Sequence, residues 1–485
     1  MYDRSVVPVE GGAVDTVAGP DVPVSDVDQR ALRFWQQMSL AAAPVGAPQP
    51  APMPVPGELR GVLSLFEASA EGSLHGGPSA PSAGALYPYE HYAVVGDPLA
   101  PAVYAVDATR RTCRLLHRGA SVARALADGG LELPGQNGAL VLIAIRPWLS
   151  MRKYDDRGYL YAQLDTAHLG THLLCLAAPG HRRAEWLTRA ATGALAGLLR
   201  LGERHVFAHS VLLLGDPVDE EPSLARSWSC ADWRGMPFGT RPAGSSEERC
   251  WRALAPYLPS PPTRPAAARH RALLSGPEAG DGPHTTHHQE ELTALAARRR
   301  SAKDFAAGEL PVARLRQALA RLGTPLTTDL ADADGFGVTL VARDIAGLDQ
   351  GAYSVQAGAL VPRPTAAPAM SGDDIVRICM GQEQLRHSSA AVVLHTRHAD
   401  IFRRGMRGVD EALLRAGALA QLLYLGATDA GMAVTTIGGF DAGRWHTLAG
   451  LPDEDEVLYV AMLGLPGTST VKSDRLQPAH AHGQR

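Results

Sequence analysis

Two groups of residues in this sequence have the types and spacing that proton transfer and phosphate binding require. Lys153 and Tyr154 are adjacent and precede a long helical pattern, and such a pair can exchange protons near neutral pH once burial and mutual charge lower their pKa values. The second group offers guanidinium forks, a hydroxyl and a compact charge, which could grip a phosphate monoester. Its members are Arg299, Arg300, Ser301 and Lys303. Exposed helix ends often carry similar residues, so spacing alone leaves structural roles open for both groups.

Two stretches of small residues could let a flat ligand lie against the backbone. The first leads from a Gly/Ser-rich loop into an apolar run and contains Pro81, Ser82, Ala83, Gly84, Leu86 and Tyr87. The second follows a helical pattern and contains Thr435, Ile437, Gly438 and Gly439. Glycines there would admit backbone amides close to a ring system. An ordinary connector and a helix C-cap are the competing interpretations.

Local patterns predict the elements that must position these residues. Strands are expected at 89–95, 103–106, 113–116 and 139–145, and helices at 28–40, 59–70, 159–178, 312–322 and 409–429. The pair at 153 and 154 therefore precedes a long helix, and the first loop runs directly into a strand.

An internal repeat decides the expected architecture. Tyr104-Ala-Val106 recurs as Tyr353-Ser-Val355, His172 to Ala178 as Gln421 to Ala427, and Leu213 to Pro217 as Met462 to Pro466. All three pairs are 249 residues apart, and the apolar runs at 139–145 and 390–395 also match, so we expect two copies of one α+β unit. The expected division is a flexible arm at 1–58, a first copy at 59–218, a Pro/Gly-rich linker at 219–288, a second copy at 289–470 and a disordered tail at 471–485.

Composition narrows the class of protein. The chain has 485 residues, 45% of them hydrophobic and 20% charged, with a net charge of −4, which disfavours a general binder of nucleic acid or anionic membrane. The five cysteines are widely spaced without a CxxC, so we expect a reducing cytoplasm, and no apolar run is long enough to span a membrane. P-loop, Rossmann and GxSxG motifs are missing from the sequence.

The loop and the basic stretch both resemble motifs of one family. Ser82-Ala-Gly-Ala-Leu-Tyr-Pro88 resembles the flavin-facing loop of SagB-type dehydrogenases, a branch of the nitroreductase superfamily, which also carry a Lys-Tyr pair at the place of Lys153 and Tyr154. Arg299 to Phe305 resembles the flavin-phosphate motif of nitroreductases, with lysine where the last arginine is usual. Ile437-Gly-Gly439 resembles the turn that these enzymes place against the isoalloxazine.

The resemblance implies a nitroreductase-like α+β fold, duplicated in tandem as an intramolecular pseudo-dimer, with FMN as the cofactor. It implies oxidation of thiazoline or oxazoline rings in a ribosomally made precursor peptide, with Lys153 and Tyr154 handling the proton and O2 re-oxidising the flavin. Its implied partners are that peptide and a cyclodehydratase complex, and a further homodimer is compatible with it. Asp165, His168 and His172 share a helical face suited to a metal, but the family has a histidine near there without one, so we expect no metal.

Two other functions stay open. One is an NAD(P)H-dependent flavin enzyme on the same fold that reduces small molecules. The other is a scaffold without catalysis that holds a cyclodehydratase partner. The motifs also divide unequally, since the basic stretch and the Ile-Gly-Gly turn occur in the second copy alone and the Pro-Ser loop in the first. One flavin per chain is therefore expected.

Overall fold

The computed structural model describes residues 50–70, 79–135, 137–178, 180–218, 224–234, 246–258, 267–274, 286–331, 335–356, 359–364 and 370–469. All of them belong to one compact unit. The expected helix at 28–40 and the tail beyond 470 lie outside the described residues.

The first half of the described chain builds a ten-stranded sheet in the order β1-β8-β4-β3-β2-β5-β7-β6-β12-β9. Its strands are β1 (Ala51–Met53), β2 (Tyr89–Val95), β3 (Ala102–Asp107), β4 (Thr112–Arg118), β5 (Ala139–Ile145), β6 (Ala184–Leu187), β7 (Phe207–Leu214), β8 (Ser229–Asp232), β9 (Arg269–Arg271) and β12 (Leu326–Thr328). The four strands predicted in this half are confirmed as β2 to β5. Strand β1 lies in the segment that was expected to be a flexible arm, and β8 lies in the segment that was expected to be a linker. These two strands pair with each other.

The second half builds a seven-stranded sheet in the order β10-β19-β17-β13-β15-β16, with β18 paired to β19. Its strands are β10 (Phe305–Ala306), β13 (Phe336–Ala342), β15 (Gly351–Gln356), β16 (Ala359–Pro362), β17 (Ala390–Arg397), β18 (Ala433–Ile437) and β19 (Asp455–Pro466). A small parallel pair is formed by β11 (Leu310–Pro311) and β14 (Ile345–Ala346). The stretch expected as a glycine turn thus contains β18, because Val434, Thr435 and Thr436 are β-branched and suit a strand.

The two sheets share one strand order. The series β4-β3-β2-β5-β7-β6 corresponds to β16-β15-β13-β17-β19-β18, and neighbours in both series are antiparallel. Strand β12 crosses from the second half and pairs with β6 of the first sheet. The halves are therefore joined by backbone pairing as well as by side-chain packing.

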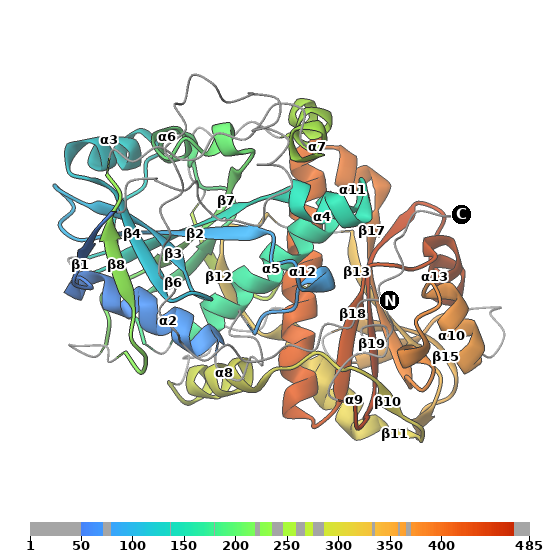
Figure 1. Cartoon of the computed structure of the whole chain (residues 1–485). Coiled ribbons are helices and arrows are strands. Elements are labelled where there is room, and N and C mark those ends of the chain that lie inside the picture. The colour runs from blue at the N-terminus through green and yellow to red at the C-terminus, as the bar shows by residue number, and fades with distance from the viewer. Residues whose placement is uncertain are drawn as a thin grey trace, which may run out of the picture. The chain divides into compact units, whose positions relative to one another are not determined.

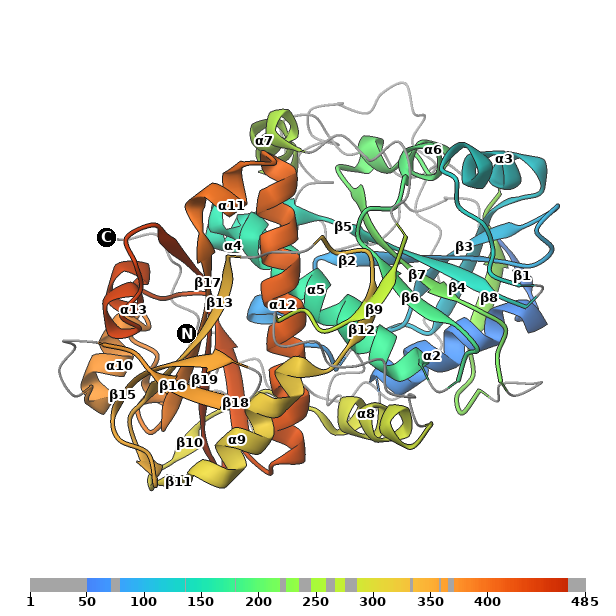
Figure 2. The same cartoon turned by 180° about the vertical axis from the view of Figure 1, so that it is seen from behind.

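The two long helices, α5 (Arg157–Ala177) and α12 (Met406–Asp429), lie side by side between the sheets (Figure 1 and Figure 2). They touch closely at Gly417, where an added β-carbon would lie 2.6 Å from the β-carbon of Ala167. One continuous apolar core includes residues of both halves along this contact. The helices expected at 159–178 and 409–429 are thus confirmed, and they form the centre of the molecule.

Shorter helices cover the outer faces and ends. They are α2 (Arg60–Ala70), α3 (Ala120–Asp128), α4 (Pro147–Tyr154), α6 (Gly193–Leu198), α7 (Ser246–Leu254), α8 (Thr286–Arg298), α9 (Val312–Ala320), α10 (Gly372–Ile378), α11 (His398–Phe402) and α13 (Ala442–Leu448). Helix α7 and strand β8 occupy part of the segment expected as linker. Among the described helices, none has the length and apolar character needed to cross a bilayer.

Candidate active site

A buried carboxylate of α5 holds the loop before β2. Asp165 accepts a hydrogen bond from the Ser82 hydroxyl at 2.6 Å and from the Ala83 amide at 3.0 and 3.1 Å, while Ser82 Oγ accepts one from the Tyr87 amide at 2.9 Å. Three loop residues adopt left-handed φ values, 62° at Gly84, 55° at Ala85 and 47° at Tyr87. Left-handed non-glycine residues persist where surrounding contacts over-determine the backbone. Here Asp165 holds Ser82 and Ala83, and Ser82 Oγ in turn holds the Tyr87 amide.

The pKa of Asp165 is changed by its burial and by its hydrogen bonds. Burial raises the pKa of its carboxyl to about 7, against the opposing effect of the hydrogen bonds from Ser82 and Ala83. The helical spacing of Asp165 indicated only a metal ligand, whereas in the structure its carboxylate anchors the loop. The signal that could have revealed this is that Asp165 is the one acidic residue within the helical pattern expected at 159–178.

The Lys-Tyr pair meets this loop at Gly84. Both residues end α4, and Asp155 with φ 49° separates that helix from α5. A β-carbon on Gly84 would lie 2.5 Å from the Tyr154 hydroxyl oxygen and 2.7 Å from Lys153 Nζ, so a side chain there would displace the pair. Lys153 Nζ lies 5.2 Å from the centre of the Tyr154 ring. Lys153 is exposed and Tyr154 half-buried, so the protein's own residues do not complete the burial expected for the pair.

Arg157 and Tyr161 connect the pair to the glycine turn of the second half. The rings of Tyr154 and Tyr161 meet edge to face, with centres 4.9 Å apart. Arg157 donates to the Tyr161 hydroxyl at 3.3 Å and to the Gly438 carbonyl at 3.2 Å. A β-carbon on Gly438 would lie 2.3 Å from a Tyr161 ring carbon, so only glycine fits there.

The other predicted residues of this stretch differ in their exposure. Thr435 and Ile437 are buried in β18, whereas Gly439 is half-buried beyond its end. Backbone approach to a ligand is therefore possible at Gly438 and Gly439, while Thr435 and Ile437 contribute their side chains to packing.

Arg299 forms the buried end of the basic stretch. Its Nη2 donates to the Ser79 carbonyl of the first half, its Nη1 donates to Ser301 Oγ at 3.2 Å, and the guanidinium lies 4.9 Å from the centre of the Tyr424 ring. Burial lowers its pKa to about 10, and its Nε is buried without a hydrogen-bond partner among the described residues. Arg299 therefore joins the two halves and retains one unsatisfied donor.

The remaining members of the basic stretch are more accessible. Arg300 is exposed and donates to the carbonyls of Arg299 at 2.7 Å and Ala297 at 3.2 Å. Ser301 is half-buried, with its hydroxyl 3.1 Å from that of Tyr424, and Lys303 is half-buried with a partner of its own. This set presents cationic and hydroxyl donors near one another, as an anion site requires.

A buried polar chain runs between the two long helices beside Arg299. Its successive contacts are Ser79 Oγ to His172 at 2.9 Å, His172 to Gln421 at 3.3 Å, Gln421 to His168 at 3.1 Å and His168 to Tyr459 at 3.3 Å. Burial lowers the pKa of His168 and of His172 to about 3, so both are neutral at physiological pH. No group of three or more potential metal ligands occurs among residues that the structure describes.

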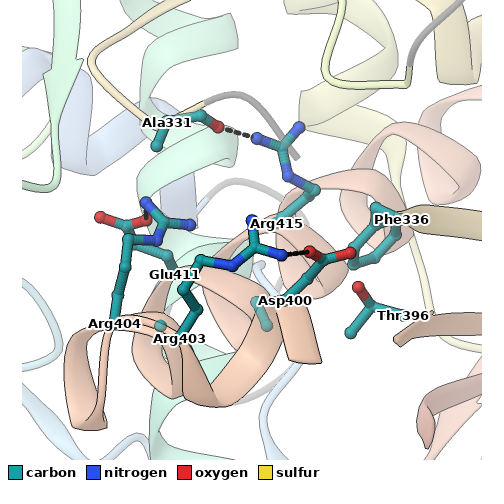
Figure 3. A pocket seen from close by; sticks show the side chains of 10 residues that line it. Ala331, Phe336, Thr396, Asp400, Arg403, Arg404, Glu411 and Arg415 are labelled. Carbon is teal, nitrogen blue, oxygen red and sulfur yellow. Dashed lines mark hydrogen bonds and ion pairs between the residues drawn. The ribbon is translucent and has the colours of Figure 1, made fainter. Parts of the chain in front are cut away.

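The segment that lies 249 residues after Lys153, Tyr154 and Asp165 in the sequence has different charged and polar side chains (Figure 3). Arg404 is ion-paired with Glu411, and Arg403 lies 3.4 Å from Asp400. Arg415, whose neighbour Leu414 is the counterpart of Asp165, donates to the Ala331 carbonyl. A cavity of about 170 Å³ remains among these side chains, so the chain's own ion pairs occupy much of this region.

Comparison with known proteins identifies part of the chain. Residues 296–465 match the model of the Nitroreductase family. This segment is a nitroreductase-family domain. No curated protein matches the chain. A candidate nitroreductase from Anabaena variabilis is similar over 86% of this chain and 90% of its own, with 22% identity and a TM-score of 0.62.

Two further solved structures match shorter parts. The E. coli microcin synthetase McbBCD complex with truncated pro-MccB17 covers 35% of this chain and 70% of its own, at 17% identity and a TM-score of 0.29. The Vibrio harveyi NADPH:FMN oxidoreductase complexed with NAD+ covers 40% and 77%, at 19% identity and a TM-score of 0.26. The Anabaena match extends the fold similarity beyond the nitroreductase-family domain into the first half.

Proposed function

We propose that this protein is an FMN-dependent dehydrogenase that oxidises thiazoline or oxazoline rings of a ribosomally made precursor peptide to the aromatic azoles. The observation that carries the proposal is the meeting of the loop at Gly84 with Lys153 and Tyr154, two motifs that are about 70 residues apart in sequence. The nitroreductase-family domain supports a flavin-dependent oxidoreductase. The resemblance to SagB-type dehydrogenases supplies the substrate class, and with it a cyclodehydratase complex as a partner.

The residues present fit FMN. Ser301, Arg300 and Lys303 would hold its phosphate, and the unsatisfied Arg299 Nε is a further donor for a phosphate oxygen. Gly438 and Gly439 on one side and the loop from Pro81 to Tyr87 on the other would enclose the ring, since both expose backbone. The phosphate residues belong to the second half and the loop to the first, so the site would be composite.

The chain's own share of the reaction is positioning and proton transfer. FMN, when bound, supplies the acceptor for the hydride that leaves the azoline ring, and O2 is the final oxidant. Lys153 in its neutral form would take the proton from the adjacent ring carbon, and Tyr154 would orient the lysine amine. Aromatisation of the ring favours the products. Lys153 is exposed to solvent in the structure. A peptide ring bound over Gly84 would shield it from water.

We also propose that the two halves are copies of one nitroreductase-like unit that form a pseudo-dimer within the chain. The shared strand order and the three sequence pairs at one spacing support this. In the region equivalent to the ring turn, Asp329 accepts from the Thr188 amide at 2.6 Å and the Arg189 amide at 2.9 Å. These donors are therefore already satisfied, so one flavin per chain is expected.

The decisive experiment incubates the purified protein with an azoline-containing peptide in air and follows the peptide by mass spectrometry. Loss of two hydrogens per ring, together with a flavin absorption spectrum, supports the proposal. Flavin binding with NADPH consumption but no change in the peptide would favour a small-molecule reductase. Colourless protein that only retains a cyclodehydratase would favour the scaffold.

A further inference from the structure

A cavity of about 610 Å³ lies in the region related to the candidate active site by the 249-residue spacing. Its walls come from the turn after β6, from α6, from the start of β7, from α7 and from the first turns of α12. The turn residues Thr188 to Ala190 are the counterparts of Ile437 to Gly439, and Asp410 is the counterpart of Tyr161. The cavity is thus equivalent in position to the space beside the glycine turn at Gly438 and Gly439. Its volume is in the range of small-molecule sites.

Most of the lining is apolar. Its apolar members include Ala190, Ala196, Leu201, Val206, Phe207, Trp251, Leu258 and Leu414. The rings of Phe207 and Trp251 lie 6.3 Å apart and form an aromatic wall. Such a surface favours a ligand with an apolar, aromatic body.

The polar groups of the cavity are mostly engaged with one another. Arg200 pairs with Glu203 at 2.5 Å. Glu411 lies 3.7 Å from Arg189 and is also ion-paired with Arg404. Arg407 has a partner of its own. Arg200, Glu203, Arg189 and Glu411 thus each have an opposite charge beside them.

Asp410 is the exception. Among described residues, its hydrogen bond comes from the Tyr159 hydroxyl, which donates to Oδ1 at 2.6 Å. Oδ2 retains its capacity to accept, and the charged residues nearest to it in the lining are Arg407 and Glu411. A half-buried carboxylate with unused acceptor capacity selects for a charged donor.

We propose that this cavity is a second ligand site that binds a hydrophobic amine, with the aromatic body against Trp251 and Phe207 and the ammonium group at Asp410. Flavin fits this cavity less well, since the amides of Thr188 and Arg189 already donate to Asp329 and the lining arginines Arg189 and Arg200 each have a carboxylate beside them. This site is independent of the proposed oxidation and would exist whatever the reaction at Lys153.

The site should respond to pH through one group. Burial raises the pKa of Asp410 to about 7, with Tyr159 and Arg407 opposing and Glu411 adding to the effect. Burial lowers the pKa of His209, which also lines the cavity, to about 3, so it stays neutral. The lining residues Trp251 of α7 and Leu258, which follows that helix, carry no charge. An ammonium ligand should therefore bind more tightly as pH rises and Asp410 ionises.

The experiment measures binding of tryptamine, tryptophol and indoleacetate to the full-length protein by calorimetry. We expect tryptamine to bind about tenfold more tightly than tryptophol near pH ~8, with the difference lost below pH ~6. Asp410→Asn should remove the preference for the amine. Gly197→Leu, whose added side chain meets open space within the lining, should weaken both ligands and so locates them in this cavity.

Three results would overturn the proposal: equal affinity for amine and alcohol at both pH values, tighter binding of indoleacetate, or tryptamine binding that Gly197→Leu leaves unchanged. The pH comparison uses the unmodified protein, so it decides the matter even where a variant fails to fold. Thermal unfolding of each variant checks its folding.

Discussion

The candidate active site and its counterpart region are built on the same strand order, yet their polar chemistry is reversed. In the first, the carboxylate of Asp165 accepts hydrogen bonds from the loop at Ser82 and Ala83. In the second, the guanidinium of Arg415 donates to the loop carbonyl of Ala331, and an apolar Leu414 is the counterpart of Asp165. One scaffold thus anchors its two loops through opposite backbone groups, an amide at Ala83 and a carbonyl at Ala331.

Charge balance separates the two regions as well. Arg300 is exposed in the active site, and Arg299 there has an unsatisfied donor. In the counterpart region, Arg404 is paired with Glu411. Free cationic donors recruit an anionic cofactor, whereas paired ones do not. On the proposed function, this difference is one reason to expect a single flavin per chain.

The largest expected effect comes from the catalytic pair. Lys153→Ala should keep flavin bound but lose azoline oxidation by about a hundredfold or more, because a general base is removed, and Tyr154→Phe should lose less. Turnover is measured by mass spectrometry of the peptide. Arg403→Ala, at the cation of the counterpart segment, is the matched control and should leave the rate unchanged. Normal turnover in Lys153→Ala would refute the assigned role.

The second effect concerns the loop anchor. Asp165→Leu, which introduces the residue type of Leu414, should weaken flavin binding by about tenfold or more, since hydrogen bonds to a charged group contribute about 1.5–3 kcal/mol each. Asp165→Asn keeps an acceptor for Ser82 and Ala83 and should retain most of the affinity. Flavin titration followed by fluorescence quenching measures both. If Leu and Asn substitutions behave alike, the anchoring role is wrong.

The third effect tests the asymmetry directly. Flavin released by heat from a known amount of protein should approach one per chain, and Arg300→Ala should lower that ratio. Arg299→Ala should lower it too, with an added loss of stability because Arg299 also joins the halves through Ser79. A ratio near two per chain would contradict the division between the two regions.

The smallest expected effect is on the pH dependence of stability. The folded pKa of Asp410 is raised to about 7 from 3.8, so between these values the folded state binds more protons than the unfolded state. Stability should therefore fall as pH rises through this window, by at most about 1.4 kcal/mol per pH unit. The pKa of Asp165 is also raised, so Asp165 contributes a pH dependence of the same sign. The contribution of Asp410 is therefore the difference in the pH dependence of the free energy of unfolding between wild type and Asp410→Asn, measured by urea unfolding.

The sequence by itself determined the local elements and the motifs. Strand β2 and strand β5 have the predicted limits. Strand β5 is an uninterrupted apolar run and β2 is an aromatic-rich run that ends in three apolar residues, and turn residues bound both. The repeat at one constant spacing predicted a shared strand order. The loop at Gly84 and the pair at Lys153 could each be recognised in the sequence, because each is a motif of consecutive residues.

Tertiary structure alone decided which residues meet. Asp165 and Arg157 contact the loop and Gly438 from 82 and 281 residues away in sequence, and no local pattern encodes such pairings. The strand at β18 was missed because glycines at both ends suggested a turn, whereas pairing with β19 stabilises an extended backbone. The cavity beside Asp410 was also invisible in the sequence, because its walls come from five segments whose separate patterns indicate only helix, strand or turn. Side-chain contacts over long sequence separation depend on how the halves pack, and that packing is a property of the whole fold.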